Sequence, residues 1–288
     1  MKHVLILGAT GMLGSAVAKK LTGSRKYRVT ATCRGTAWST LEEVVPNGLG
    51  NTRMVFDPEC FTDHDDNHYI PFRNEPYDYI INCIGIIKPQ ITKVGTECAV
   101  RVNSLFPHVL ARYCAEHHIG LIHITTDCVY SGVKGNYIET DVHDCDDVYG
   151  KTKSLGEPAD QAMVLRTSII GPEIHNFSSL VSWAQSQAGK AVNGFTNHKW
   201  NGITTKMYGA VVETIIDNTM WGPGLFHVFS PRPVTKFELL QMIDNRYELH
   251  LAINSTEATV PVDRILDTKW GLCHTLNIPD LRTQIAEM

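Results

Sequence analysis

The stretch Gly8-Ala9-Thr10-Gly11-Met12-Leu13-Gly14 stands between a short apolar run at residues 4–7 and an amphipathic pattern at about residues 12–21. In such a turn from strand to helix, Gly8 permits the tight turn, Gly11 lets the backbone approach a pyrophosphate, and Gly14 lets the helix pack closely on the strand. Amide groups at the start of the helix would face the phosphate charge. A glycine trio can be a tight turn without a ligand, but its place after the first strand of an alternating pattern predicts a dinucleotide site.

Apolar runs and helical patterns alternate along the first part of the chain. The apolar runs are typical of buried strands and occur at residues 4–7, 28–33, 53–56, 79–84, 121–124 and 163–167. Helical patterns occur at about residues 12–21 and 97–117, and another begins near Asp147. This alternation predicts an α/β fold with a doubly wound, Rossmann-like parallel sheet, covered by helices on both faces, that binds ligands at the carboxyl ends of its strands.

The composition and pattern of the sequence change after Gly171. Residues 194–202 are rich in Asn, Gly and aromatic side chains, and they indicate an excursion out of the sheet. Helical patterns return at residues 207–218 and 234–244, with a strand-like run at 225–229 between them. We therefore expect residues 1–170 to form an NAD(P)-binding Rossmann domain with a returning segment at about 205–230. Residues 171–204 and 231–288 would form a smaller, interwoven α/β substrate-binding lobe.

Composition excludes several classes of protein. The chain has 288 residues, of which 43% are hydrophobic and 19% charged, as in an ordinary globular protein. Lys and Arg total 26 against 30 Asp and Glu, and this net charge of −4 argues against a nucleic-acid partner. No apolar window approaches the roughly 18 residues of a membrane span, and the N-terminal apolar run is too short for a signal peptide. We therefore expect a cytoplasmic protein without a membrane partner.

The cysteines and histidines do not predict a metal site. The eight cysteines are scattered without a Cys-x-x-Cys pair, and we expect them to be reduced thiols used as small core residues. Of the 13 histidines, His117 and His118 lie near Cys114, but no paired-ligand spacing supports a metal there.

Arg34 directly follows the second strand-like run, where NAD-binding folds usually place Asp or Glu. An acid there binds the ribose 2′-hydroxyl, whereas an arginine accommodates a 2′-phosphate, so Arg34 favours NADPH, with NADH as a second possibility. The alternative is a solvated loop arginine. Asp57 closes the third strand and could accept a hydrogen bond from the adenine amino group, or it could initiate a turn ahead of Pro58.

Two further signals concern catalysis. In Tyr149-Gly150-Lys151-Thr152-Lys153, the first and last residues share a helical face. An ammonium near the phenol of Tyr149 favours the phenolate, which would make Tyr149 a usable general acid toward a carbonyl being reduced. Thr126 lies at the carboxyl end of a predicted strand and could hydrogen bond the same carbonyl oxygen. Either motif alone could be a surface helix or a local turn; their joint occurrence in this order is far more specific.

The chain resembles the extended short-chain dehydrogenases/reductases, and among them the dTDP-4-dehydrorhamnose reductase family. The resemblance covers nearly the whole chain. It rests on residues 8–14, Asn82-Cys83-Ile84-Gly85, Val102-Asn103-Ser104 with Pro107, residues 125–130, Lys134-Gly135-Asn136-Tyr137 with Glu139, residues 149–153 with Gly156-Glu157, Leu165-Arg166-Thr167-Ser168, residues 224–228 followed by Thr235-Lys236-Phe237, and Asp263-Arg264 with Leu266-Asp267.

The resemblance implies a role for particular residues. Catalytic positions of the family fall on Thr126, Tyr149 and Lys153, with Asn103 supporting Lys153 through a water. Cofactor positions fall on Gly8, Thr10, Gly11, Met12, Leu13, Arg34, Asp57, Ile84, Gly85, Tyr149 and Lys153. Substrate positions fall on Asp127 and Cys128, with Trp200 as a candidate for stacking on a nucleotide base and Arg264 as a candidate pyrophosphate clamp. Cys128 departs from the family, which often has Tyr there.

The function implied is NADPH-dependent reduction of the 4-keto group of a nucleotide-activated deoxysugar, in sugar-nucleotide and polysaccharide biosynthesis. The partner would be a nucleoside-diphosphate sugar, and a homodimer is an option for the assembly. One alternative is a sugar-nucleotide epimerase or dehydratase, although dehydratases place Asp-Glu after the catalytic Thr where this chain has Asp127-Cys128. The other is a non-catalytic NADP-binding regulatory subunit, because a regulatory subunit of methionine adenosyltransferase also resembles this family.

Overall fold

The computed structural model describes residues 1–46, 48, 50–58, 75–174, 177 and 179–288. These form two compact units. Unit 1 comprises Met1–Thr125, Asp147–Leu165 and Tyr208–Leu225, and unit 2 comprises Thr126–Asp146, Arg166–Met207 and Phe226–Met288. The domain boundaries expected from sequence remain a prediction; in this division, residues 126–146 group with unit 2 rather than with the first domain.

A seven-stranded sheet runs through the molecule, and it is the doubly wound parallel sheet that the sequence predicts. Its spatial order is β11 (Gly224–His227), β6 (Met163–Thr167), β5 (Gly120–Thr126), β4 (Tyr79–Asn82), β1 (Lys2–Leu7), β2 (Tyr27–Cys33) and β3 (Thr52–Val55). The chain winds outward from β1 in both directions, because β1 pairs in parallel with β2 on one side and with β4 on the other. The switch point therefore lies between β1 and β4, where ligands bind in this architecture.

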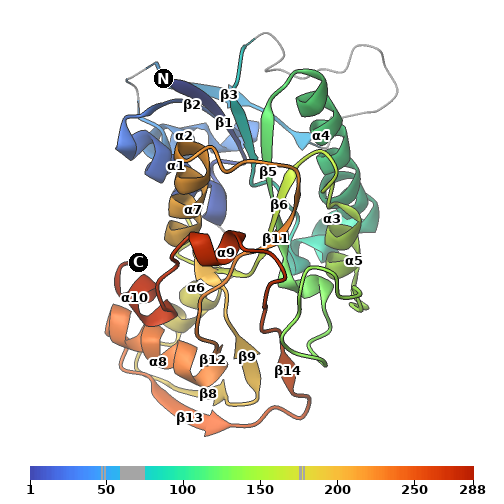
Figure 1. The fold of residues 1–288 in the computed structure, drawn as a ribbon. Coiled ribbons are helices and arrows are strands. Elements are labelled where there is room, and N and C mark those ends of the chain that lie inside the picture. Colours follow the sequence, from blue (N-terminus) through green and yellow to red (C-terminus); the bar gives the residue numbers. More distant parts are fainter. Residues whose placement is uncertain (47, 49, 59–74, 175–176, 178) are drawn as a thin grey trace. The chain divides into compact units, whose positions relative to one another are not determined.

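Helices cover both faces of the sheet (Figure 1). One face carries α1 (Met12–Ser24) and α7 (Thr205–Asp217), with α2 (Trp38–Val44) near the sheet edge. An ion pair of 2.8 Å between Lys20 and Glu213 links α1 to α7. The other face carries α3 (Lys88–Val100), α4 (Phe106–Glu116) and α5 (Val148–Leu155). The helix expected at residues 97–117 is continuous from the second part of α3 through one π-helical turn at Arg101–Leu105 into α4, and the break in α3 lies earlier, at Gly95 (φ +88°). Pro107 explains the wide turn, since it lacks the N–H that would bond to the carbonyl of Asn103.

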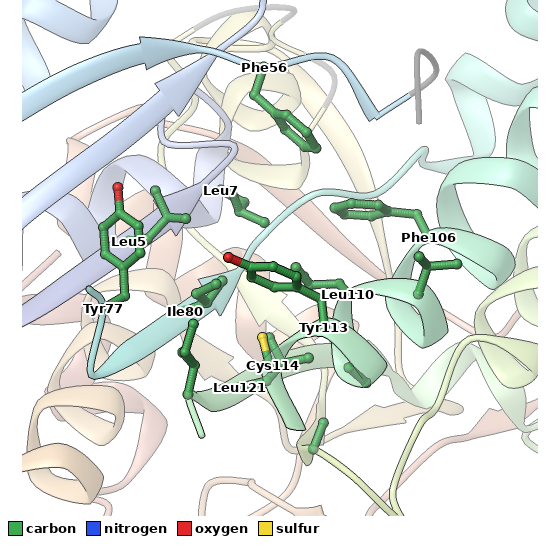
Figure 2. Packing of buried hydrophobic residues seen from close by; sticks show 14 of the residues in the cluster. Leu5, Leu7, Phe56, Tyr77, Ile80, Phe106, Leu110, Tyr113, Cys114 and Leu121 are labelled. Carbon is green, nitrogen blue, oxygen red and sulfur yellow. The ribbon is translucent and has the colours of Figure 1, made fainter. Parts of the chain in front are cut away.

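The core of unit 1 lies between the sheet and α4. Figure 2 shows Leu5, Ile80 and Leu121 of three adjacent strands together with Phe106 and other side chains of α4. Burial of such apolar side chains is the main stabilising contribution to a fold of this kind. This packing holds the carboxyl ends of β1 and β4 at defined positions.

Unit 2 is built from short strands and helices around its own core. Its strand sets are β7 (Ile169–Ile170) with β10 (Ile203–Thr204), β8 (Ala191–Phe195) with β13 (Ala252–Thr256), and β12 (Val234–Thr235) with β9 (His198–Trp200) and β14 (Val262–Asp263). Its helices are α6 (Leu180–Ser186), α8 (Lys236–Tyr247), α9 (Leu272–Thr275) and α10 (Leu281–Ala286). A capping box formed by Thr235 and Glu238 starts α8 beside β9. The excursion expected at residues 194–202 contains β9 and the end of β8.

Candidate functional site

The glycine turn after β1 has the geometry that binding a dinucleotide requires. Gly8 has φ +78°, a conformation that favours glycine, and a Cβ on Gly14 would lie 2.2 Å from the Gly8 carbonyl oxygen. Gly11 is the N-cap of α1 and is exposed, with no side-chain cap over the first turn. The side chain of Leu13 is buried, so Leu13 could contact a phosphate only through its backbone. Backbone amides at the start of α1 are therefore open to an anion.

Arg34 and Asp57 follow neighbouring strands at the same edge of the sheet. The register pairs Cys33 at the end of β2 with Val55 at the end of β3. Arg34 comes next after β2 and is exposed, whereas Asp57 is half-buried. The positive charge of Arg34 is thus beside the position that this fold gives to the adenosine ribose.

The loop after β4 is held by Asn103. The amide oxygen of Asn103 accepts a hydrogen bond from the Ile86 N–H (2.8 Å), and its amide nitrogen donates to the Ile86 carbonyl (2.9 Å) and to the hydroxyl of Thr152 on α5 (3.2 Å). Ile84 donates its N–H to the side chain of Asn82. These bonds fix Ile84 and Gly85 at the carboxyl end of β4, next to the switch point of the sheet.

Lys153 is a buried cation behind this loop. It lies on α5, one turn after Tyr149, and its Nζ donates to the Ile124 carbonyl at 3.0 Å. A Cβ on Gly85 would lie 3.9 Å from Nζ and 3.5 Å from the amide oxygen of Asn103, so both groups border the same small space. Burial lowers the pKa of Lys153 to about 8, although Glu157 and Cys83 oppose the shift. Such a shift is typical of lysines in functional sites.

Thr126 ends β5 and begins a turn that presents three polar side chains. Its hydroxyl accepts a hydrogen bond from the Cys128 N–H (3.1 Å) and donates to the carboxylate of Asp127 (3.2 Å). Asp127 is only 3% exposed, and burial raises its pKa, while the charges of Arg264 and Lys236 oppose the shift. Cys128 is half-buried.

Arg264 lies against this turn, within unit 2. It donates hydrogen bonds to the carbonyls of Tyr130 (3.0 Å) and Ser131 (3.5 Å), and its Nη1 lies 3.7 Å from the Cys128 sulfur. Lys236, at the start of α8, is the second cation, and burial lowers its pKa while Asp127 and Cys128 oppose the shift. The turn after β5 therefore carries a thiol next to the guanidinium of Arg264, and the charge of Lys236 also acts on this thiol.

Trp200 lies in the core of unit 2. It is 6% exposed, and it packs with Val234 and Leu240 in the apolar cluster around α8. The Nζ of Lys236 lies 5.4 Å from the centre of its ring. Trp200 is thus a packing residue in this structure, and its stacking on a nucleotide base stays a prediction.

One family model matches most of the chain. It is described as RmlD substrate binding domain, and the match extends over residues 1–269. The chain belongs to this family. Every site residue predicted from the sequence lies within the matched range, which spans parts of both units.

Two kinds of curated relative are similar to this RmlD-family chain. A dTDP-4-dehydrorhamnose reductase of Aggregatibacter actinomycetemcomitans is 30% identical over 237 residues, which cover 79% of this chain and 73% of the relative. Methionine adenosyltransferase 2 subunit beta of Mus musculus is 26% identical over 260 residues, which cover 86% of this chain and 73% of that protein. The resemblance stated from the sequence is confirmed, and so is the kinship with the adenosyltransferase subunit.

A solved structure confirms the fold. The dTDP-4-dehydrorhamnose reductase from Bacillus anthracis str. Ames, in complex with NADP, has a TM-score of 0.74 and 17% identity. The alignment covers 100% of this chain and 98% of that one. At this identity the likeness establishes the RmlD-family fold, and the bound NADP is a property of the other protein.

Sequence reasoning missed Lys236 as a candidate site residue. Lys236 directly follows the N-cap Thr235, so the local sequence indicates only the first turn of an ordinary helix. Its charge acts on Asp127 and Cys128, more than a hundred positions earlier in the chain. Among the described residues, no group of His, Cys, Asp and Glu could hold a metal ion, and no helix is long and apolar enough to span a membrane.

Proposed function

We propose that this chain is an NADPH-dependent reductase of a 4-keto sugar carried on a nucleoside diphosphate, acting in sugar-nucleotide and polysaccharide biosynthesis. The observation that carries the proposal is the buried Lys153, one helical turn from Tyr149 and beside Gly85. Family membership and the reductase among the relatives support it. NADP in the Bacillus anthracis structure supports the choice of cofactor, and NADH remains a second option.

The residues around the switch point fit a dinucleotide. The glycine turn would hold the pyrophosphate through backbone amides, and a 2′-phosphate would meet the guanidinium of Arg34. Asp57 would accept a hydrogen bond from adenine, and Ile84 with Gly85 would line the path toward the nicotinamide. Lys153 would hold the nicotinamide ribose. When bound, the cofactor supplies a hydride for the keto carbon.

Tyr149 supplies the proton in this proposal. As the keto carbon is reduced, Tyr149 donates its phenolic proton to the oxygen, and Thr126 donates a hydrogen bond that orients this oxygen. The ammonium of Lys153 stabilises the resulting phenolate. Lys153 can exchange protons near neutral pH, because burial lowers its pKa to about 8. Asn103 positions Lys153 through a water.

The test is oxidation of NADPH in the presence of 4-keto-6-deoxy sugars linked to dTDP, UDP or GDP. We expect turnover with at least one of them. Tyr149→Phe should lower kcat by roughly 10²–10⁴-fold, the usual contribution of a general acid, with nearly unchanged NADPH affinity. The control is Tyr247→Phe, which alters a tyrosine near the end of α8 and should keep full activity. Near-normal turnover of Tyr149→Phe would contradict the assignment.

A second candidate function follows from the adenosyltransferase relatives. A subunit that binds NADP without reducing a sugar would use the same glycine turn and Arg34. The same assay separates the two candidates. NADPH binding without oxidation by any keto sugar in the panel, together with association with a methionine adenosyltransferase, would favour the subunit.

A further inference from the structure

We propose that His123 is a positioning residue for the cofactor, which fixes the side-chain amide of Asn82 and, through that amide, the loop toward which the nicotinamide would extend. This inference rests on the proposed function, because it needs a bound nicotinamide dinucleotide. His123 would contact neither the cofactor nor the sugar and would act only through Asn82. The proposal assigns a role to a buried histidine that the proposed mechanism does not use.

His123 and Asn82 lie opposite each other on two neighbouring parallel strands of unit 1. The register pairs Asn82, the last residue of β4, with His123 of β5, and both side chains are fully buried. The amide nitrogen of Asn82 lies 3.0 Å from the ring Nδ1 of His123, and the amide oxygen accepts a hydrogen bond from the Ile84 N–H (3.1 Å). One side-chain amide therefore joins the imidazole to the loop after β4.

The loop held in this way borders the glycine turn. A Cβ on Gly8 would lie 3.0 Å from the Cγ1 of Ile84, so the side chain of Ile84 lies directly against this turn. Asn103 holds the far end of the loop, through the N–H and the carbonyl of Ile86. Gly85 lies between the two anchored residues. Its backbone is therefore fixed from both sides by a buried side-chain amide.

The directions of these hydrogen bonds determine which ring nitrogen of His123 carries the proton. Because the amide oxygen of Asn82 accepts from the Ile84 N–H, the group that faces the ring is the NH₂, which can only donate. Nδ1 is then the acceptor, and the proton of the neutral ring lies on Nε2. A donor at Nδ1 would favour the reversed amide, whose NH₂ would oppose the Ile84 N–H. An accepting Nδ1 therefore selects the amide orientation that holds the loop.

The surroundings of His123 keep its ring neutral. Burial lowers the pKa of His123 well below its ordinary value of 6.5, and the charges of Lys153 and His108 act in the same direction. The backbone of Gly156 favours the charged form but does not reverse the shift. The ring is therefore neutral at and above pH 6.5, and Nδ1 remains an acceptor throughout that range.

The experiment compares the whole cofactor with its adenosine half. Titration calorimetry measures the dissociation constants of NADPH and of adenosine 2′,5′-bisphosphate, which carries the adenine and the 2′-phosphate but no nicotinamide. His123→Leu leaves the buried NH₂ of Asn82 without its acceptor, so we expect NADPH to bind roughly tenfold more weakly, while the bisphosphate binds as in the wild type. A purely structural role of His123 would not change the ratio of the two constants.

His123→Asn is the conservative variant, because its side-chain oxygen can accept where Nδ1 did, and it should restore NADPH affinity to near the wild-type value. With the keto sugar, His123→Leu should also lower kcat by roughly ten- to a hundredfold, because the nicotinamide is misplaced relative to the keto carbon. A further measurement uses the wild type alone. The nitrogen-15 NMR signals of His123, assigned by comparison with His123→Asn, should show a neutral ring protonated on Nε2 at pH 6.5 and above.

The matched control is His3→Leu, which removes another buried histidine of unit 1. The ring of His3 is hydrogen bonded to Thr30 (2.9 Å) near the amino end of β1, whereas the cofactor is expected at the carboxyl ends of the strands. His3→Leu should therefore lower the midpoint of thermal unfolding and leave both dissociation constants unchanged.

Undiminished NADPH affinity in a folded His123→Leu would overturn the proposal. Equal weakening of both ligands, a weak His123→Asn, or a His123 ring protonated on Nδ1 would overturn it as well. The expected binding pattern without NADPH oxidation by any keto sugar would instead overturn the reductase and keep His123 as a positioning residue. No binding of either nicotinamide dinucleotide by the wild type would overturn both.

Discussion

At the scale of single residues, the buried ammonium of Lys153 lowers the stability of the fold at neutral pH. Burial lowers its pKa from the ordinary 10.5 to about 8. Between pH 8 and 10.5 the unfolded chain binds a proton at this residue that the native state does not bind, so its contribution to stability rises with pH in this window. Below pH 8 Lys153 is protonated in both the native and the unfolded state, but only the native state buries the charge. The cost of this burial then lowers the free energy of unfolding by its full amount.

Lys153→Met should therefore stabilise the fold at pH 7. We expect a gain of about 1–3 kcal/mol in the free energy of unfolding, from roughly 1.4 kcal/mol per pKa unit less the lost bond to the Ile124 carbonyl. The gain should fade as pH rises toward 10.5, and activity should be lost at all pH values. Urea unfolding at several pH values measures this, with the exposed Lys151→Met as the control on the same helix. A variant less stable than wild type at pH 7 would contradict the reasoning.

Arg34 is predicted to select NADPH over NADH. A charge-assisted hydrogen bond contributes about 1.5–3 kcal/mol, or roughly ten- to a hundredfold in affinity. We expect the lower figure, because Arg34 is exposed and salt screens its charge. Dissociation constants of both cofactors for wild type, Arg34→Ala and the surface control Arg25→Ala provide the test. An unchanged ratio in Arg34→Ala would show that this arginine does not contact the 2′-phosphate.

At the scale of elements, β1 and α1 depend on Gly14. A Cβ at this position would lie 2.2 Å from the Gly8 carbonyl oxygen and 3.0 Å from the Ala9 Cα, so the helix would have to move away from the strand. We expect Gly14→Ala to cost about 2–4 kcal/mol, in the range of severe core substitutions, and to weaken NADPH binding. Chemical denaturation and a cofactor titration measure both effects.

Gly23 in the same helix is the matched control. A Cβ there meets no atom within 4 Å, so Gly23→Ala should be neutral or stabilise the fold by up to about 1 kcal/mol through helix propensity. If Gly14→Ala and Gly23→Ala had equal effects on stability, close packing between α1 and β1 would not be the reason that position 14 requires a glycine.

At the scale of the whole molecule, cofactor binding should be linked to folding. A ligand that binds only the native state stabilises it by about 2.7 kcal/mol at a hundredfold excess over its dissociation constant. We expect NADPH to raise the midpoint of thermal unfolding in the wild type, and to raise it much less in Gly14→Ala, in which the turn at Gly8 and the start of α1 would be displaced. Scanning fluorimetry with and without NADPH measures the shift. No shift in the wild type would contradict a dinucleotide site in unit 1.

The sequence by itself determined the alternating strands and helices, the glycine turn after β1, and the helix near Asp147 that carries Tyr149 and Lys153. Each is a local pattern, because the period of apolar residues, a glycine or a capping side chain acts within a few positions of the chain. The helix expected at residues 97–117 is present, but the π-helical turn near Pro107 and the helical segment that begins at Lys88, before the kink at Gly95, were not predicted.

Only the tertiary structure decided which side chains share a site and how strongly their protonation is perturbed. Arg264 contacts a cysteine 136 positions earlier, and Lys236 affects the same thiol from a helix whose sequence pattern shows only a start signal. Burial lowers the pKa of Lys153, whose Nζ donates to the carbonyl of Ile124 in β5, 29 positions earlier in the chain. Desolvation and charge act through space, so their effects follow from the packed fold and not from the order of residues along the chain.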